Sequence, residues 1–186
     1  WTLLLYHIAG SYAEEKPWEL LKCYIPVCMI ALKTHSSAAA DRYSRKAAAG
    51  CPSLIQSLSK EAIPIFSQIH HCGSVLAEVF FAMMISRILY GSVPAPSNMV
   101  IFSVLLATCS MGTPGLPWGT VMASLGTLTG ILKFGDSGIA LMFAVFALHD
   151  AFAAACNMTC DGALALFLTG YARRHEPFRN FPSSRV

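Results

Sequence analysis

Charged residues are scarce in this sequence. Only 12% of the 186 residues are Asp, Glu, Lys or Arg, and 55% are hydrophobic, whereas a soluble domain has about 25% charged and about 45–50% apolar residues. The net charge of +3 is small, and Lys and Arg are dispersed without interleaved aromatic residues. This distribution gives no support to a nucleic-acid partner. The composition instead indicates a protein that has membrane lipid as its surroundings.

Several signals are also missing. No basic region precedes the apolar residues 1–8, so no secretory signal peptide is predicted, and we interpret the start as a truncation. The seven cysteines include no two matching CxxC pairs for zinc, which predicts small buried apolar side chains. No nucleophile and base recur at a usable spacing. The sequence therefore predicts neither an enzyme nor an organic cofactor.

The apolar segments have mixed lengths. They cover residues 20–32, 75–90, 100–107 and 139–148. A spanning helix needs about 20 apolar residues, and runs of about 10–14 are typical of re-entrant or buried helices. We therefore predict an all-α polytopic membrane protein. The basic residues in connecting and terminal segments indicate one cytoplasmic side: Lys16, Arg42, Arg45, Lys46, Lys60, Arg173, Arg174, Arg179 and Arg185.

Proline, glycine and serine clusters divide the chain into helices. Two helix pairs with polar or Gly-Pro tips predict re-entrant hairpins, and a polar, Gly-containing break in a long helix indicates a site, because unpaired backbone at membrane depth needs a cavity. The predicted boundaries are 1–9 for the end of a transmembrane helix, 17–58 for hairpin 1, 59–90 for the broken transmembrane helix, 98–133 for hairpin 2, 139–171 for the last transmembrane helix and 172–186 for a cytoplasmic tail.

The last predicted helix carries a polar stripe. Asp150, Asn157 and Asp161 are spaced by seven and four residues, which places them on one helix face. A charged side chain near the bilayer centre costs roughly 2.5–3.5 kcal/mol, so such residues need partners. The stripe therefore predicts an ion or substrate site. The alternative is that these groups only pair with neighbouring backbone.

These motifs together resemble the dicarboxylate and amino acid:cation symporter family, which includes the glutamate transporters. Residues 70–74 (His-His-Cys-Gly-Ser) stand at the family's Asn-Met-Asp-Gly-Thr break. Residues 112–115 (Gly-Thr-Pro-Gly) resemble its Gly-Val-Pro-Gly tip, and residues 157–161 (Asn-Met-Thr-Cys-Asp) resemble its Asn-Val-Thr-Gly-Asp stretch. The resemblance implies a secondary symporter of the inner membrane. It also implies elevator-type alternating access, hairpin 2 as gate, and a homotrimer when full length.

The resemblance also assigns roles. Asp150 would receive the substrate's amino group, Asn157 would contact both substrate and cation, and Asp161 would bind Na⁺. The substrate's carboxylate would lie between the hairpin tips, and Ser74 would contact its side chain. The tip residues are Ser36, Ser37, Gly112, Thr113, Pro114 and Gly115. For the two serines, an ordinary helix cap is the alternative.

The chain departs from the family at several positions. Ala153 stands where dicarboxylate-selective members have an arginine, which favours a neutral or small substrate unless His35 supplies a positive charge. His70 and Cys72 remove two oxygen ligands from the family's sodium sites. Proton coupling through Glu78 or His70 is therefore an alternative to Na⁺. Glu78 could equally pair with a hydroxyl or with Arg87.

Two readings of function remain. The first is a symporter for an amino acid or small carboxylate, coupled to Na⁺, H⁺ or both. The second is a truncated or degenerate relative that acts as a nontransporting membrane protein.

Overall fold

A computed structural model describes residues 1–113 and 118–175, and within these ranges all regular structure is helical. The helices are α1 (Thr2–Ala13), α2 (Pro17–Thr34), α3 (Ser37–Ala49), α4 (Gln56–Ile69), α5 (Cys72–Tyr90), α6 (Pro96–Ser110), α7 (Gly119–Gly130) and α8 (Asp136–Arg174). This agrees with the predicted helical class.

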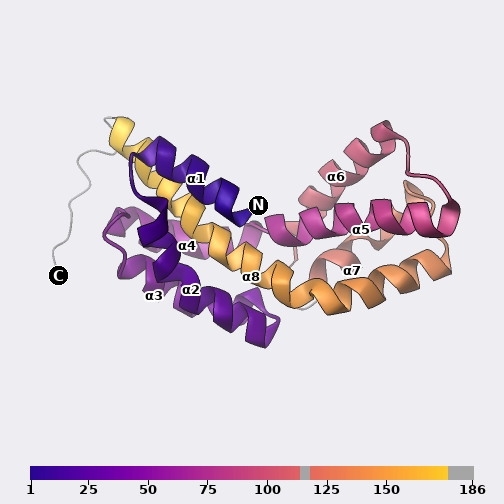
Figure 1. Ribbon diagram of the computed structural model, residues 1–186, viewed down its shortest axis with the longest axis horizontal. Helices are drawn as coiled ribbons and strands as arrows, with labels where there is room; N and C mark the ends of the chain where they lie inside the picture. The colour runs from indigo at the N-terminus through magenta and orange to yellow at the C-terminus, as the bar shows by residue number, and fades with distance from the viewer. Residues whose placement is uncertain (114–117, 176–186) are drawn as a thin grey trace.

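The long helix α8 is the axis of the molecule (Figure 1). Helices α1 to α4 gather around its C-terminal half and α5 to α7 around its N-terminal half, so two helical groups share one helix (Figure 1). By length and composition, two segments within residues 1–113 and 118–175 can cross a membrane: Gln56–Tyr90, which joins α4 and α5, and Asp136–Arg174. The 39 residues of α8 extend about 58 Å, which exceeds the hydrocarbon thickness of about 30 Å.

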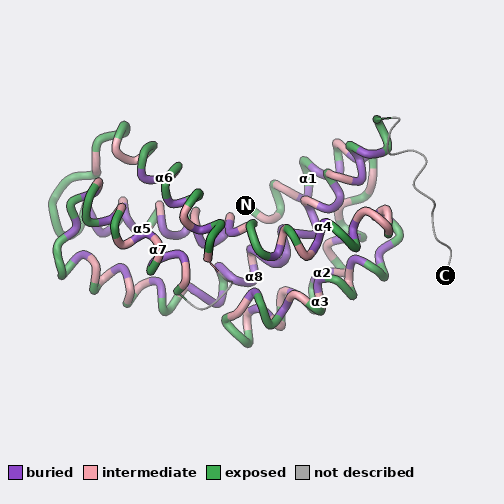
Figure 2. The backbone as a smooth tube through the Cα atoms, turned by 180° about the vertical axis from the view of Figure 1, so that it is seen from behind, coloured by how far each residue is buried: buried purple, intermediate pink, exposed green. Residues whose placement is uncertain are grey.

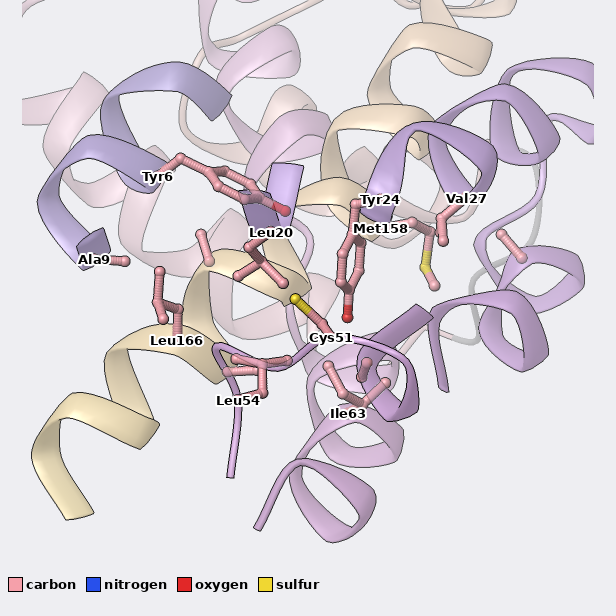
Figure 3. Close-up of a cluster of buried hydrophobic side chains, with 14 of the residues drawn as sticks. Tyr6, Ala9, Leu20, Tyr24, Val27, Cys51, Leu54, Ile63, Met158 and Leu166 are labelled. Carbon is pink, nitrogen blue, oxygen red and sulfur yellow. The ribbon is translucent and has the colours of Figure 1, made fainter. Parts of the chain in front are cut away.

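The first core lies between α1, α2, α3, α4 and α8, and Figure 3 shows part of it. Gly162 of α8 permits this packing, because an added Cβ would lie 2.6 Å from the Tyr6 hydroxyl and 2.8 Å from the Tyr24 ring. The Tyr6 hydroxyl donates to the Thr159 carbonyl at 2.9 Å. A residue without a side chain on α8 thus lets two buried tyrosines lie against the helix.

The second core lies between α5, α6, α7 and α8. Phe102, Leu106, Val121, Leu128 and Phe146 are buried in it. Buried residues follow the inward faces of the helices, and exposed residues cover the outside (Figure 2). Large apolar side chains such as Val100 and Leu148 are among the exposed ones, as expected where lipid or further protein covers a helix.

Two pairs of helices lie in the segments predicted as hairpins: α2 and α3 in the first, and α6 and α7 in the second. In hairpin 1, α2 and α3 pack against each other and meet at His35 and Ser36. On α3, Arg45 forms an ion pair with Asp41 at 2.7 Å, and Ser67 of α4 donates to the same carboxylate at 2.8 Å. In hairpin 2, α6 and α7 are likewise in contact.

Several predicted boundaries need correction. Helix α1 continues through Ala13 instead of ending at residue 9. Gly10 lies inside it, and an added Cβ there would lie 2.8 Å from the Pro17 ring. Helix α8 begins at Asp136 and ends at Arg174, three residues beyond 139–171 at each end. The predicted break of five residues narrows to His70 and His71, because Cys72 already begins α5.

Candidate functional site

The two hairpin tips, the helix break and the middle of α8 meet at a small cavity. Its described lining consists of His35, Ser37, His71, Ser74, Thr113, Gly119, Thr120, Asp150, Ala154 and Asn157. The cavity has about 20 Å³ of space for water, which is room for about one molecule. Six residues predicted from the sequence are therefore brought together: His35, Ser37, Ser74, Thr113, Asp150 and Asn157.

The two serines at the tip of hairpin 1 have different positions and contacts. Helix α2 ends at His35, which adopts a left-handed conformation with φ 52°. The Ser36 hydroxyl accepts a bond from the Ala39 N–H and so caps α3. Ser37 lines the cavity. Ser36 thus acts as an ordinary helix cap, which was the alternative considered for both serines. Ser37 lies at the cavity, where it could contact a ligand.

The tip of hairpin 2 also reaches the cavity. Thr113 lines it and donates from its hydroxyl to the Ser110 carbonyl at 2.7 Å. Gly112 is exposed and is not among the lining residues. Pro114 and Gly115 lie outside the described residues. Past the tip, the Trp118 backbone and Gly119 begin α7 beside the cavity.

The polar stripe of α8 is buried along its whole length. Asp150 is 6% exposed, Asn157 is 3% exposed and Asp161 is fully buried. Asp150 lies beside His35 and the backbone of Trp118, and its Oδ2 atom has no hydrogen-bond partner among the described residues. Such an atom is costly to bury without a partner. Asp150 therefore presents an acceptor to whatever enters the cavity.

Asn157 holds the start of α5. Its Oδ1 atom accepts bonds from the N–H groups of Gly73 at 2.7 Å and Ser74 at 3.3 Å, and its Nδ2 donates to the Ser74 hydroxyl at 2.9 Å. The first N–H groups of a helix have no partners within the helix. A side chain from α8 thus caps α5, and this amide is already engaged before any ligand is considered.

Asp161 lies one turn further along α8, away from the cavity lining. Its Oδ1 atom is 3.1 Å from His70 Nδ1, and its Oδ2 atom has no hydrogen-bond partner among the described residues. His70 comes from the break between α4 and α5. The pair therefore joins the break to α8, with one carboxylate oxygen left over for a further cation or donor.

Glu78 is fully buried between α5 and α7. The Ser124 hydroxyl of α7 donates to Glu78 Oε1, and Thr120 lies beside the carboxylate. The other oxygen, Oε2, has no partner in the described part of the chain. Arg87 instead donates to the Gly91 carbonyl. Two partners for Glu78 were considered from the sequence, a hydroxyl and Arg87. In the structure Glu78 pairs with a hydroxyl and not with Arg87.

Four lining residues were not predicted as site residues: His71, Gly119, Thr120 and Ala154. Gly119 and Thr120 follow closely after the Gly-Pro tip, and this position in the sequence could have identified them as site residues. His71 contacts the Gln68 carbonyl at 3.2 Å. Ala153, the position singled out for its missing arginine, has its carbonyl against Gly73. The next residue, Ala154, lines the cavity in its place.

Comparison with known proteins gives one family. Residues 1–170 match the sequence profile described as the sodium:dicarboxylate symporter family. No curated protein matches the chain significantly. The matched segment contains every described residue of the cavity lining.

Proposed function

Because this chain belongs to the sodium:dicarboxylate symporter family, a family of transporters and not of enzymes, we propose that it is the substrate-carrying part of a sodium-coupled symporter. The proposed substrate is an amino acid or a small carboxylate. The observation that carries this proposal is the cavity at which both hairpin tips, the helix break and Asp150 meet.

The lining favours a substrate with an amino group and one carboxylate. Among the described lining residues, Asp150 is the only acid and there is no Arg or Lys. Asp150 Oδ2 would accept from the ammonium group. The hydroxyls of Ser37, Ser74 and Thr113 would donate to the carboxylate, with help from the N-terminal end of α7, which favours anions. A second substrate carboxylate would find no Arg or Lys among the described lining residues, and His35 and His71 are the nitrogen-bearing side chains there besides Asn157.

Asp161 is the proposed sodium ligand. Its unpaired oxygen is a hard donor, which suits a hard cation. Asn157 acts mainly as a positioning residue, because its side chain is bonded to Gly73 and Ser74. The cation contact assigned to Asn157 by resemblance would then come from its backbone.

Hairpin 2 is the proposed gate in an elevator-type movement. A cavity of about 20 Å³ is far smaller than ligand pockets of about 300–1,000 Å³, so the tip must move to admit an amino acid. Re-entrant insertion of both hairpins, a multi-pass location in the inner membrane with the tail in the cytoplasm, and a homotrimer of the full-length protein belong to the same proposal.

Removing the Asp150 charge tests the substrate site. In Asp150→Asn, binding of a neutral amino acid should weaken about 10- to 100-fold, because a hydrogen bond to a charged group contributes about 1.5–3 kcal/mol. The measurement is isothermal titration of the purified protein with alanine and serine in saturating sodium. Lactate, which lacks the amino group, is the matched control ligand, and its affinity should change little. Equal losses for alanine and lactate would refute the ammonium contact.

Proton coupling through Glu78 makes a separate prediction. Glu78→Gln keeps an acceptor for Ser124 but cannot ionise, so substrate affinity should lose its dependence on pH between mildly acidic and neutral conditions. The affinity of the parent protein, measured over the same range, is the reference. If Glu78→Gln keeps the pH dependence and His70→Asn removes it, His70 carries the proton instead.

A second candidate is a nontransporting membrane protein. It is favoured by His70, which occupies one oxygen of Asp161, and by Cys72 in place of a family aspartate. Both changes reduce the oxygen ligands for sodium. Uptake of labelled amino acids into proteoliposomes with a sodium gradient distinguishes the two: gradient-driven uptake supports the symporter, and binding or folding without uptake supports the second candidate.

A further inference from the structure

Three cysteines from distant parts of the chain meet beside the helix break. Cys72 begins α5, and Cys156 and Cys160 lie one turn apart on α8. Their three sulphur atoms all lie within 4.8 Å of one another. Cys160 is buried and the other two are partly buried. This thiol cluster is separate from the cavity lining and takes no part in the proposed symport.

The hydroxyl of Thr2 lies beside two of these sulphurs. Thr2 Oγ1 lies 3.2 Å from Cys156 Sγ and 3.5 Å from Cys160 Sγ, and the two sulphurs are 3.9 Å apart. In a tetrahedral site with zinc–sulphur bonds of about 2.3 Å and a zinc–oxygen bond of about 2.1 Å, the sulphurs lie about 3.8 Å apart and the oxygen about 3.6 Å from each. The observed spacings are close to these values.

We propose that Cys72, Cys156, Cys160 and Thr2 form a Zn²⁺ site that fastens α1 and the start of α5 to α8. Thiolates select soft or borderline ions such as Zn²⁺ and Cu⁺. Each thiol gives up its proton when the ion binds. Three thiolates leave a net charge of −1 with Zn²⁺ and −2 with Cu⁺, and the smaller charge costs less to bury at membrane depth. The N-terminal end of α5 also favours the negative charge at Cys72.

The cluster is reachable from the surface. Thr2 and Cys156 line a groove of about 680 Å³ between α1, α2 and α8. A metal site needs such an entry path. The Sγ atom of Cys72 lies within 4.8 Å of the other two sulphurs, so each of its sulphur–sulphur distances has to shorten by no more than about 1 Å to match the tetrahedral spacing.

Zinc binding to the purified whole protein tests the proposal. After chelator treatment under reducing conditions, one Zn²⁺ per chain should bind in competition with a chromophoric chelator. Co²⁺ used in place of Zn²⁺ should give the thiolate charge-transfer bands and intense visible bands of tetrahedral coordination. Cys72→Ser, Cys156→Ser and Cys160→Ser should each lower zinc affinity about 100-fold, and Thr2→Val should lower it about tenfold.

Cys28→Ser is the matched control, because Cys28 lines the same groove but does not belong to the cluster. It should keep full zinc affinity. Thermal unfolding of each metal-free variant checks the fold, so a variant that loses zinc but unfolds at the parent's temperature has lost a ligand. Failure to bind zinc, binding of Cu⁺ alone, or unchanged zinc affinity in the triple serine variant would overturn the proposal. Because no substrate is involved, the result is independent of the proposed symport.

Discussion

Asp161→Asn is expected to remove the sodium dependence of substrate binding while the fold persists. Asn has the same shape as Asp and still offers an oxygen to His70, so the buried pair at 3.1 Å can be kept. The lost charge removes the strongest ligand available to a cation there, and a contact of about 1.5–3 kcal/mol corresponds to about 10- to 100-fold weaker sodium binding. Isothermal titration with the amino acid at increasing sodium concentrations measures this loss.

Asp136→Asn is the control for that experiment. Asp136 lies on the same helix in its first turn, is exposed, and undergoes the same chemical change. Its sodium affinity should equal that of the parent protein. Sodium affinity that survives in Asp161→Asn, or that falls equally in Asp136→Asn, would show that the buried carboxylate does not hold the coupling ion.

The helices and the polar stripe of α8 could be predicted because they depend on local rules. Pro17 opens α2 as expected, and spacings of seven and four place Asp150, Asn157 and Asp161 on one face at 3.6 residues per turn. The same rule argues against the pairing of Glu78 with Arg87. Nine residues make two and a half turns, so the two side chains leave opposite faces of α5, as observed.

The contacts between helices could not be predicted in this way. Nothing in the spacing of Asn157 shows that its amide caps α5 at Gly73, 84 residues earlier in the chain. The pairing of His70 with Asp161 spans 91 residues. Cys156 and Cys160 share a face by their spacing of four, but only the tertiary packing brings Cys72 to them. A periodic pattern in the sequence shows which residues share one face of a helix. It does not show which other helix packs against that face.

Gly73→Ala is expected to disturb both the fold and the site. An added Cβ would lie 2.6 Å from Cys156 Cβ, 2.8 Å from the Ala153 carbonyl oxygen and 3.0 Å from Asn157 Oδ1. The first two are rigid parts of α8, so α5 must move away and the Asn157 cap must lengthen. Overpacking of this kind costs about 1–3 kcal/mol, and Ser74 leaves its place in the cavity lining. Unfolding in detergent and sodium-dependent amino acid binding should both weaken.

Gly126→Ala is the matched control for Gly73→Ala, because it makes the same substitution at a position where there is room for the added methyl group. Gly126 lies inside α7, and no atom beyond its neighbours and the backbone of its own helix lies within 4 Å of an added Cβ, so the substitution should stabilise the protein by about 0.5–1 kcal/mol. A loss of stability in Gly73→Ala together with a gain in Gly126→Ala is expected because α5 rests directly on α8 at Gly73. If Gly73→Ala kept the stability and the sodium-dependent binding of the parent protein, the close approach that positions Ser74 and the Asn157 cap would not be needed for the site.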